Sequence, residues 1–166
     1  PKLVALLMVI IPFFTIQLFG MTDSNYPEMP FNPSLVLLMY ILTWTFDSFA
    51  YLIGRKLGKT KILPLISPKK SWEGFFGGYL FSILASSLSY FIFKDYFNHI
   101  STLSYILITL ILPFSATTGD FIESYYKRKA GVKDSGKIMP GHGGILDRMD
   151  AFLITIPVIY IIINIT

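Results

Sequence analysis

The stretch "SLVLLMYILTWTFDSFAYLI", residues 34–53, is an apolar run that carries a single carboxylate, Asp47, towards its end. Its 20 residues are enough to cross the hydrocarbon core of a bilayer as a helix. Comparable runs fall near residues 2–19, 74–93, 102–118 and 150–166. They are continuous rather than alternating, and a helix satisfies its own backbone in lipid. We therefore predict an all-α, polytopic transmembrane helical bundle of about five spans.

The composition of the chain agrees with a membrane protein. Of its 166 residues, 53% are hydrophobic and only 14% are charged, whereas soluble domains carry roughly 25% charged residues. The sequence contains no cysteine, which excludes thiolate metal sites and a disulfide scaffold. It begins with proline, so we expect a piece of a longer chain. No internal repeat is visible, and residues 1–166 are expected to form one domain.

Positive charge is concentrated in two connections between the apolar runs. Residues 54–73 and 119–149 each contain six lysines or arginines, residues 94–101 contain one, and residues 20–33 contain none. With Lys2, thirteen of the fourteen basic residues fall on one side of an alternating topology. Because basic loops stay in the cytoplasm, this side is predicted to be cytoplasmic. The alternative is that the charges only orient the chain and contact anionic headgroups.

The first basic connection contains a pattern typical of a helix start. Ser67 followed by Pro68 predicts a helix with Ser67 as its N-cap. Lys69 and Lys70 would lie in the first turn, where positive charge is unfavourable unless an anion binds there. We therefore regard Ser67, Lys69 and Lys70 as candidates for a phosphate-binding site. The alternative is that the two lysines merely belong to a cytoplasmic loop.

Asp47 lies inside the second span, which we expect to break at Gly54 and Gly58. A charged residue costs about 3 kcal/mol at the centre of a membrane helix and less near the interface. Asp47 is therefore expected to extend its carboxylate to the interface, to pair with a neighbouring basic residue, or to face a polar cavity. The interpretation with a polar cavity makes Asp47 a candidate substrate-binding residue.

The second basic connection brings carboxylates to the ends of two spans. Asp120 follows the fourth span, and Asp147 and Asp150 lie three residues apart at the start of the fifth. Carboxylates at a helix N-terminus cap free N–H groups, but this does not account for Asp120. Three carboxylates with basic residues around them suit Mg²⁺ and phosphate. Glu123 and Lys127, four residues apart, are expected to form an ordinary surface pair.

His142 stands in the glycine-rich segment "GHGG", residues 141–144. It could act as a general acid, bind phosphate or make a structural hydrogen bond. The chain has only two histidines, which is too few for a histidine-based zinc site.

The segment "SYYKRKAGVKDSGKIMPGHGGILDRMD", residues 124–150, resembles the signature of the phosphatidate cytidylyltransferases, also called CDP-diacylglycerol synthases. The segments "DSFAYLIGRKLGK", residues 47–59, and "SPKKSWEG", residues 67–74, are similar to other shared stretches of that family. The resemblance covers roughly residues 40–166. The matching signature positions are Ser124, Lys127, Arg128, Lys133, Asp134, His142, Gly143, Gly144, Asp147, Arg148 and Asp150.

The resemblance implies a Mg²⁺-dependent transfer of CMP from CTP to phosphatidate, giving CDP-diacylglycerol and pyrophosphate. It implies Asp120 and Asp147 as metal ligands with Asp150 in support, and a potassium ion beside magnesium. The remaining implied catalytic and phosphate-binding positions are Lys127, Arg128, His142, Ser124, Lys133 and Arg148. It also implies a bacterial inner-membrane enzyme with its active site facing the cytoplasm, further helices upstream of this chain, and a homodimer.

The sequence bears on three alternatives to this function. The aspartate pattern of the CDP-alcohol phosphatidyltransferases is absent from the sequence, which argues against that class. A CTP-dependent cytidylyltransferase acting on another lipid phosphate stays open. A transporter or an anionic-lipid-binding protein without enzymatic activity would leave the clustered aspartates without a purpose. Nothing in the sequence indicates a nucleic-acid partner.

Overall fold

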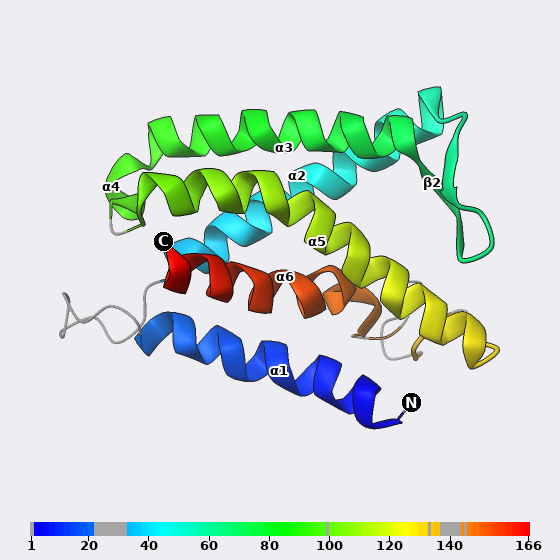
Figure 1. Cartoon of the computed structure of the whole chain (residues 1–166). Helices are drawn as coiled ribbons and strands as arrows, with labels where there is room; N and C mark the ends of the chain where they lie inside the picture. The colour runs from blue at the N-terminus through cyan, green and yellow to red at the C-terminus, as the bar shows by residue number, and fades with distance from the viewer. Residues whose placement is uncertain (1, 22–32, 99, 133, 137–143, 145) are drawn as a thin grey trace.

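The computed structural model of the chain describes residues 2–21, 33–98, 100–132, 134–136, 144 and 146–166. In chain order its elements are α1 (Lys2–Met21), α2 (Ser34–Leu57), β1 (Lys61–Leu63), β2 (Ser67–Ser71), α3 (Trp72–Ile92), α4 (Lys94–Phe97), α5 (Thr102–Lys129) and α6 (Leu146–Ile165). Figure 1 shows α3, α5, α6 and α1 lying roughly side by side, with α2 crossing behind α3 and α5. The predicted helical membrane fold is confirmed.

Three of the described helices, α2, α3 and α5, are long and apolar enough to cross a membrane, and α6 contains a shorter apolar helix, Met149–Ile165. One face of α3 carries large exposed apolar side chains at every fourth position, as a lipid-facing helix does. These are Phe76, Leu80, Leu84 and Leu88, each more than half exposed. The full count of five spans stays a prediction.

The core forms where α2, α5 and α6 meet. Leu38, Leu42, Ile108 and Leu112 have no exposed surface, and Ile159 has 1%. Hydroxyl groups add interhelical bonds, which matter in lipid because apolar burial alone does not hold helices together there. They include bonds of 2.6 Å between Ser86 and Thr109, and of 3.1 Å between Ser115 and Thr155.

The backbones of α2 and α3 approach closely because α3 presents glycines to its partner. A Cβ atom on Gly74 would lie 2.6 Å from the carbonyl oxygen of Ala50, and one on Gly78 would lie 2.6 Å from that of Phe46. Both contacts are with backbone, which cannot rotate away. The turn of α2 that carries Asp47 is therefore held directly against α3.

The predicted helix start at Ser67 is wrong, because residues 67–71 form strand β2. This strand pairs antiparallel with β1, with Lys61 opposite Ser71 and Leu63 opposite Ser67. The helix begins at Trp72 instead, and the N–H of Gly74 donates to the Ser71 hydroxyl at 3.3 Å. Pro68 is tolerated in this two-stranded hairpin because proline suits an edge strand.

A contact between distant positions explains why the hairpin forms. The Glu73 carboxylate accepts the backbone N–H groups of Lys59 and Thr60 at 3.1 and 3.0 Å. The N–H of Trp72 donates to the carbonyl of Thr60 at 3.0 Å. These bonds tie the first turn of α3 to the residues that follow α2. Residues 67–71 are thereby held as a returning strand.

The predicted break at Gly54 is also wrong, since α2 continues to Leu57. Gly54 stays helical and faces the hairpin, where a Cβ atom would lie 3.2 Å from the Ser71 hydroxyl oxygen. The predicted break at Gly58 is confirmed, because this residue caps the helix and its N–H donates to the carbonyl of Gly54 at 3.1 Å.

Replacing Ser71 with alanine should lower the free energy of unfolding by about 1 kcal/mol, because the first turn of α3 loses its side-chain cap. Denaturant unfolding of the full-length protein in detergent micelles measures this. Ser67→Ala is the matched control, and it should change stability less because Ser67 caps no helix. A larger loss of stability in Ser67→Ala than in Ser71→Ala would instead support a helix that starts at Ser67, as the sequence pattern suggests.

Candidate functional site

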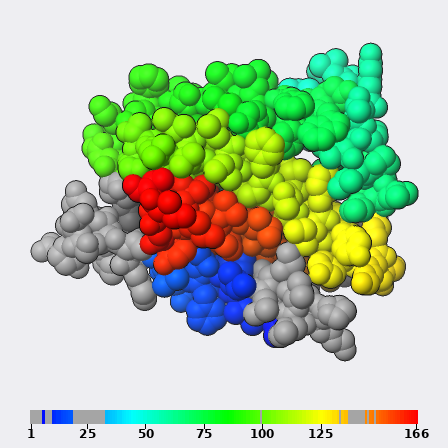
Figure 2. All heavy atoms as spheres, in the orientation of Figure 1, coloured from blue at the N-terminus to red at the C-terminus, as the bar shows by residue number. Residues whose placement is uncertain are grey.

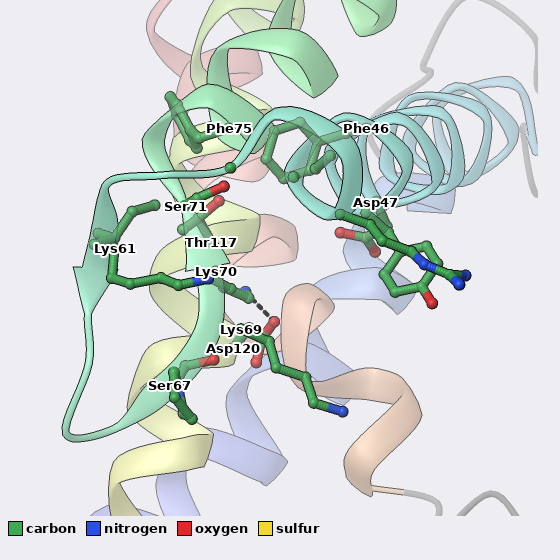
Figure 3. Close-up of a pocket in the computed structure, with 17 residues that line it drawn as sticks. Phe46, Asp47, Lys61, Ser67, Lys69, Lys70, Ser71, Phe75, Thr117 and Asp120 are labelled. Atoms are coloured by element: carbon green, nitrogen blue, oxygen red, sulfur yellow. Dashed lines mark ion pairs between the residues drawn. The ribbon is translucent and has the colours of Figure 1, made fainter.

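A cavity of about 650 Å³ opens between α2, the β1–β2 hairpin and α5 (Figure 3). The hairpin stands out at one end of the molecule beside the C-terminal part of α5 (Figure 2). The charged residues that line the cavity are Asp47, Arg55, Lys61, Lys69, Lys70 and Asp120. Ser67 and Ser71 supply hydroxyl groups, and Phe46 and Phe75 supply apolar surface.

The cavity brings together five residues that the sequence predicted for a site: Asp47, Ser67, Lys69, Lys70 and Asp120. The expectation that Asp47 faces a polar cavity is confirmed. The phosphate-binding candidates do converge, although they do so from a strand rather than from a helix N-terminus.

Lys70 and Asp120 form an ion pair across the cavity, with both side chains a little under one third exposed (Figure 3). The Lys70 ammonium also lies 4.9 Å from the centre of the Phe121 ring. The Ser124 hydroxyl, one turn further along α5, donates to Asp120 at 3.4 Å. Asp120 is therefore oriented by its own helix and neutralised by the hairpin.

Asp150 joins this group from α6. Asp47 and Asp150 each interact electrostatically with both Lys70 and Asp120. The Asp150 carboxylate also accepts the N–H of Ala151 at 2.7 Å. Of these three carboxylates, Asp120 forms the ion pair with Lys70, and Asp47 and Asp150 lie within electrostatic range of that pair.

Gly119 makes this grouping possible. A Cβ atom at this position would overlap the carbonyl oxygen of Asp150 and would lie 3.3 Å from that of Ala151. The backbones of α5 and α6 therefore touch at Gly119. Asp120 follows Gly119 directly in α5, so it lies next to the point where α5 meets the backbone of Asp150.

A second ionic cluster lies one to two turns further along α5. Lys127 donates to Asp147 at 2.8 Å and also pairs with Glu123. Glu123 is only 5% exposed. Within the described part of the chain, its two carboxylate oxygens have no partner besides this ion pair. The predicted pair of Glu123 and Lys127 forms, but its predicted place on the surface is wrong. The packing of α5 against α6 buries Glu123.

Asp147 holds the end of the glycine-rich segment against the start of α6. Besides Lys127, its carboxylate accepts the N–H of Gly144 at 2.7 Å and the N–H and hydroxyl of Ser135, each at 2.9 Å. The apolar part of α6 begins only at Met149, so Asp147 lies before the span. Burial would raise the pKa of Asp147, but the bonds from Lys127, Gly144 and Ser135 outweigh it and hold the pKa well below its usual value.

The three predicted metal ligands are not gathered at one point. Among the residues that the structure describes, no group of three or more carboxylate or imidazole side chains is close enough to hold a metal ion. Their chemistry nevertheless suits Mg²⁺, because Asp120, Asp147 and Asp150 offer only oxygen. Two of these carboxylates are already paired with a cation, because the ammonium of Lys70 contacts Asp120 and that of Lys127 contacts Asp147. The metal site stays a prediction.

The remaining predicted residues divide into two kinds. Lys133 and His142 lie outside the described residues, as does the side chain of Arg148. Arg128 lies away from the first cavity. It donates to the carbonyl of Val132 at 3.5 Å and borders a second, largely apolar cavity of about 600 Å³ beside residues 63–66.

Sequence reasoning missed Arg55, Lys61 and Glu123 as members of the site. In the sequence the two basic residues stand out only as charges of a cytoplasmic loop, because nothing local indicates the hairpin that brings Lys61 to the cavity. The burial of Glu123, in contrast, could have been predicted from the spacing of residues in the sequence. Glu123 continues the buried stripe Ile108, Leu112, Ala116 and Gly119 at helical spacing, which places it on the face of α5 that meets α6.

Comparisons with known proteins point to one family. The profile of the cytidylyltransferase family matches residues 2–166. A phosphatidate cytidylyltransferase of Staphylococcus epidermidis is 45% identical over 128 residues, covering 77% of this chain and 48% of the relative. That of Thermotoga maritima is 44% identical over 141 residues, covering 81% and 51%. That of Staphylococcus aureus is 44% identical over 128 residues, covering 77% and 48%. The chain thus spans about half the length of the curated relatives it matches.

Proposed function

Because this chain belongs to the cytidylyltransferase family, we propose that it carries the catalytic site of a phosphatidate cytidylyltransferase. The reaction joins CTP and phosphatidate to give CDP-diacylglycerol and pyrophosphate. The observation that carries the proposal is the cavity beside the C-terminal halves of α2 and α5. There, lysines and carboxylates meet beside helices that lie in lipid.

The chemistry of the reaction suits such a site. An oxygen of the phosphatidate phosphate attacks the α-phosphorus of CTP, and the bond from that phosphorus to the oxygen bridging the β-phosphate breaks. The attacking phosphate is already an anion, so no strong base is needed. The site must instead neutralise charge and align the two phosphates.

The basic residues of the cavity are suited to this work. Lys61, Lys69 and Arg55 line the cavity and would bind phosphate oxygens. Lys70 would exchange its bond with Asp120 for a bond with substrate phosphate. Lys127, with Arg128, Lys133 and Arg148, would complete the phosphate-binding groups, and His142 would act beside them. Ser67 and Ser124 would assist through their hydroxyl groups.

We further propose that Asp120, Asp147 and Asp150 hold Mg²⁺, with a potassium ion as a second cation. The oxygen-only ligand set supports this. When bound, the metal would supply neutralisation of phosphate charge. Lys70 pairs with Asp120, and Lys127 pairs with Asp147, so two of these carboxylates already attract cations.

The proposed setting is a multi-pass protein of the cytoplasmic membrane with its site on the cytoplasmic side. The concentration of basic residues in the connections 54–73 and 119–149 supports this orientation. The bacterial origin of the relatives agrees with it. Assembly as a homodimer is part of the same proposal.

The test is an assay of the full-length protein in mixed detergent–lipid micelles. We expect CDP-diacylglycerol and pyrophosphate to form only when CTP, phosphatidate and Mg²⁺ are all present. A polyprenyl phosphate offered in place of phosphatidate serves as the comparison substrate. Product from the polyprenyl phosphate alone would overturn the choice of lipid, and consumption of CTP with neither lipid would overturn the transferase assignment.

A further inference from the structure

Two buried hydroxyl groups differ from the others in the bundle. In a membrane helix a threonine or serine usually donates to a carbonyl three or four residues earlier, as Thr109, Ser115 and Thr155 do here. The hydroxyls of Thr43 and Thr117 have no hydrogen-bond partner among the residues that the structure describes. A buried hydroxyl without a partner destabilises the fold, so each of the two requires an explanation.

Thr117 differs from Thr43 in what surrounds it. Thr117 lines the cavity and is 9% exposed, and it stands one turn before Asp120 on the same face of α5 (Figure 3). Thr43 is 2% exposed and stands one turn before Asp47, but it does not line the cavity. Of the two residues, Thr117 is therefore the one that borders the cavity, and its hydroxyl oxygen is itself buried at the cavity wall.

We propose that the hydroxyl of Thr117 donates a hydrogen bond to a phosphate oxygen of the bound substrate, which makes Thr117 a further substrate-binding residue. This inference rests on the proposed function. Lys69 and Lys70 already bring positive charge to the cavity, but flexible ammonium groups fix position poorly. A hydroxyl on a packed helix is a donor in a fixed place. It would hold the phosphate against the α5 side of the cavity, one turn from Asp120.

The choice of partner follows from the chemistry of the cavity. A hydroxyl can donate to an anionic oxygen, and the surrounding lysines and arginine favour an anion. CTP and phosphatidate both carry phosphate, so the same contact could be made to either one. The experiment therefore measures the two substrates separately.

The test compares Thr117→Val with Thr43→Val in the full-length protein. Valine keeps the shape of threonine and removes only the hydroxyl, so neither variant should lose thermal stability. Thr117→Val should lower kcat/KM by about tenfold or more, because a hydrogen bond to a charged group is lost. Thr43→Val should leave kcat/KM unchanged. Thr117→Ser, which keeps a hydroxyl, should retain most of the activity.

A second readout does not depend on turnover. The rise in Tm on adding CTP alone, or phosphatidate alone, reports binding of each substrate. Thr117→Val should reduce one of these two shifts, together with a raised KM for the same substrate, and that substrate is the one that Thr117 binds. Thr43→Val should reduce neither shift.

Three results would overturn the inference. The first is a Thr117→Val protein whose kcat/KM and Tm shifts are those of the wild type, when the wild type forms product. This result would leave the proposed function intact. The second is a marked drop in the Tm of unliganded Thr117→Val, which would make the hydroxyl structural. The third is a wild-type protein whose Tm responds to neither CTP nor phosphatidate. Absence of product with a normal CTP shift that Thr117→Val reduces would instead count against the reaction alone.

Discussion

Replacing Asp147 with asparagine should reduce kcat at least about a hundredfold in the full-length protein. The carboxylate accepts donors from Lys127, Ser135 and Gly144 at the same time. Asparagine has one acceptor oxygen, and its NH₂ group would face donors instead of accepting from them. The variant would also lose a proposed Mg²⁺ ligand. Product formation at saturating CTP, phosphatidate and Mg²⁺ measures the effect.

Asp95→Asn is the matched control for this experiment. Asp95 is an exposed carboxylate in the first turn of α4, at the end of the molecule away from the hairpin (Figure 1). It should retain wild-type kcat. If Asp147→Asn also retained kcat within about twofold, Asp147 would be only a helix cap, and both its proposed metal role and its organising role would be wrong.

Replacing Gly119 with alanine should lower the free energy of unfolding by about 2 kcal/mol. An added methyl group would overlap the carbonyl oxygen of Asp150. Because this oxygen belongs to the backbone, no side-chain rotation can relieve the overlap. Alanine is intrinsically favoured over glycine within a helix by about 1 kcal/mol, so the clash must exceed this gain. Separation of α5 from α6 would also move Asp120 away from Asp150, and kcat should fall with stability. Denaturant unfolding and product assays measure the two effects.

Gly136→Ala is the control for the clash. A Cβ atom on Gly136 would have its nearest neighbour at 3.6 Å, an ordinary van der Waals contact. Its stability should stay within about 0.5 kcal/mol of wild type. A Gly119→Ala protein as stable as Gly136→Ala, or more stable than wild type, would mean that α5 and α6 do not touch at this point.

The helices and several site residues could be predicted because the information is local in the chain. Apolar run length predicted α2, α3 and α5, and a carboxylate at the end of such a run marked Asp47 as a cavity residue. The cavity then united Asp47 with Lys69, Lys70 and Asp120, as residues of one site should be.

The hairpin could not be predicted, because its cause is not local. Ser67 and Pro68 have the appearance of a helix start, and lysines have low strand propensity. What selects the strand is the Glu73 carboxylate, which binds the backbone of Lys59 and Thr60 more than ten residues earlier. The environment of Glu123 was missed for a similar reason. Its partner Lys127 lies four residues away, but the helix that buries both is α6.

The length of α5 has a consequence for the lipids in which the protein works. From Thr102 to Asp120 the helix rises roughly 27 Å, at about 1.5 Å per residue. The hydrocarbon core of a bilayer is about 30 Å thick. With Thr102 at one edge of the hydrocarbon, Asp120 would lie near the other edge, and the eight residues after it, through Arg128, would extend beyond the hydrocarbon. In a thicker membrane, hydrophobic mismatch would draw Asp120 below the phosphate plane, whereas a thinner one would lift it clear. For the proposed lipid substrate, the thickness of the host bilayer would thus set how well the lipid phosphate and the cavity meet.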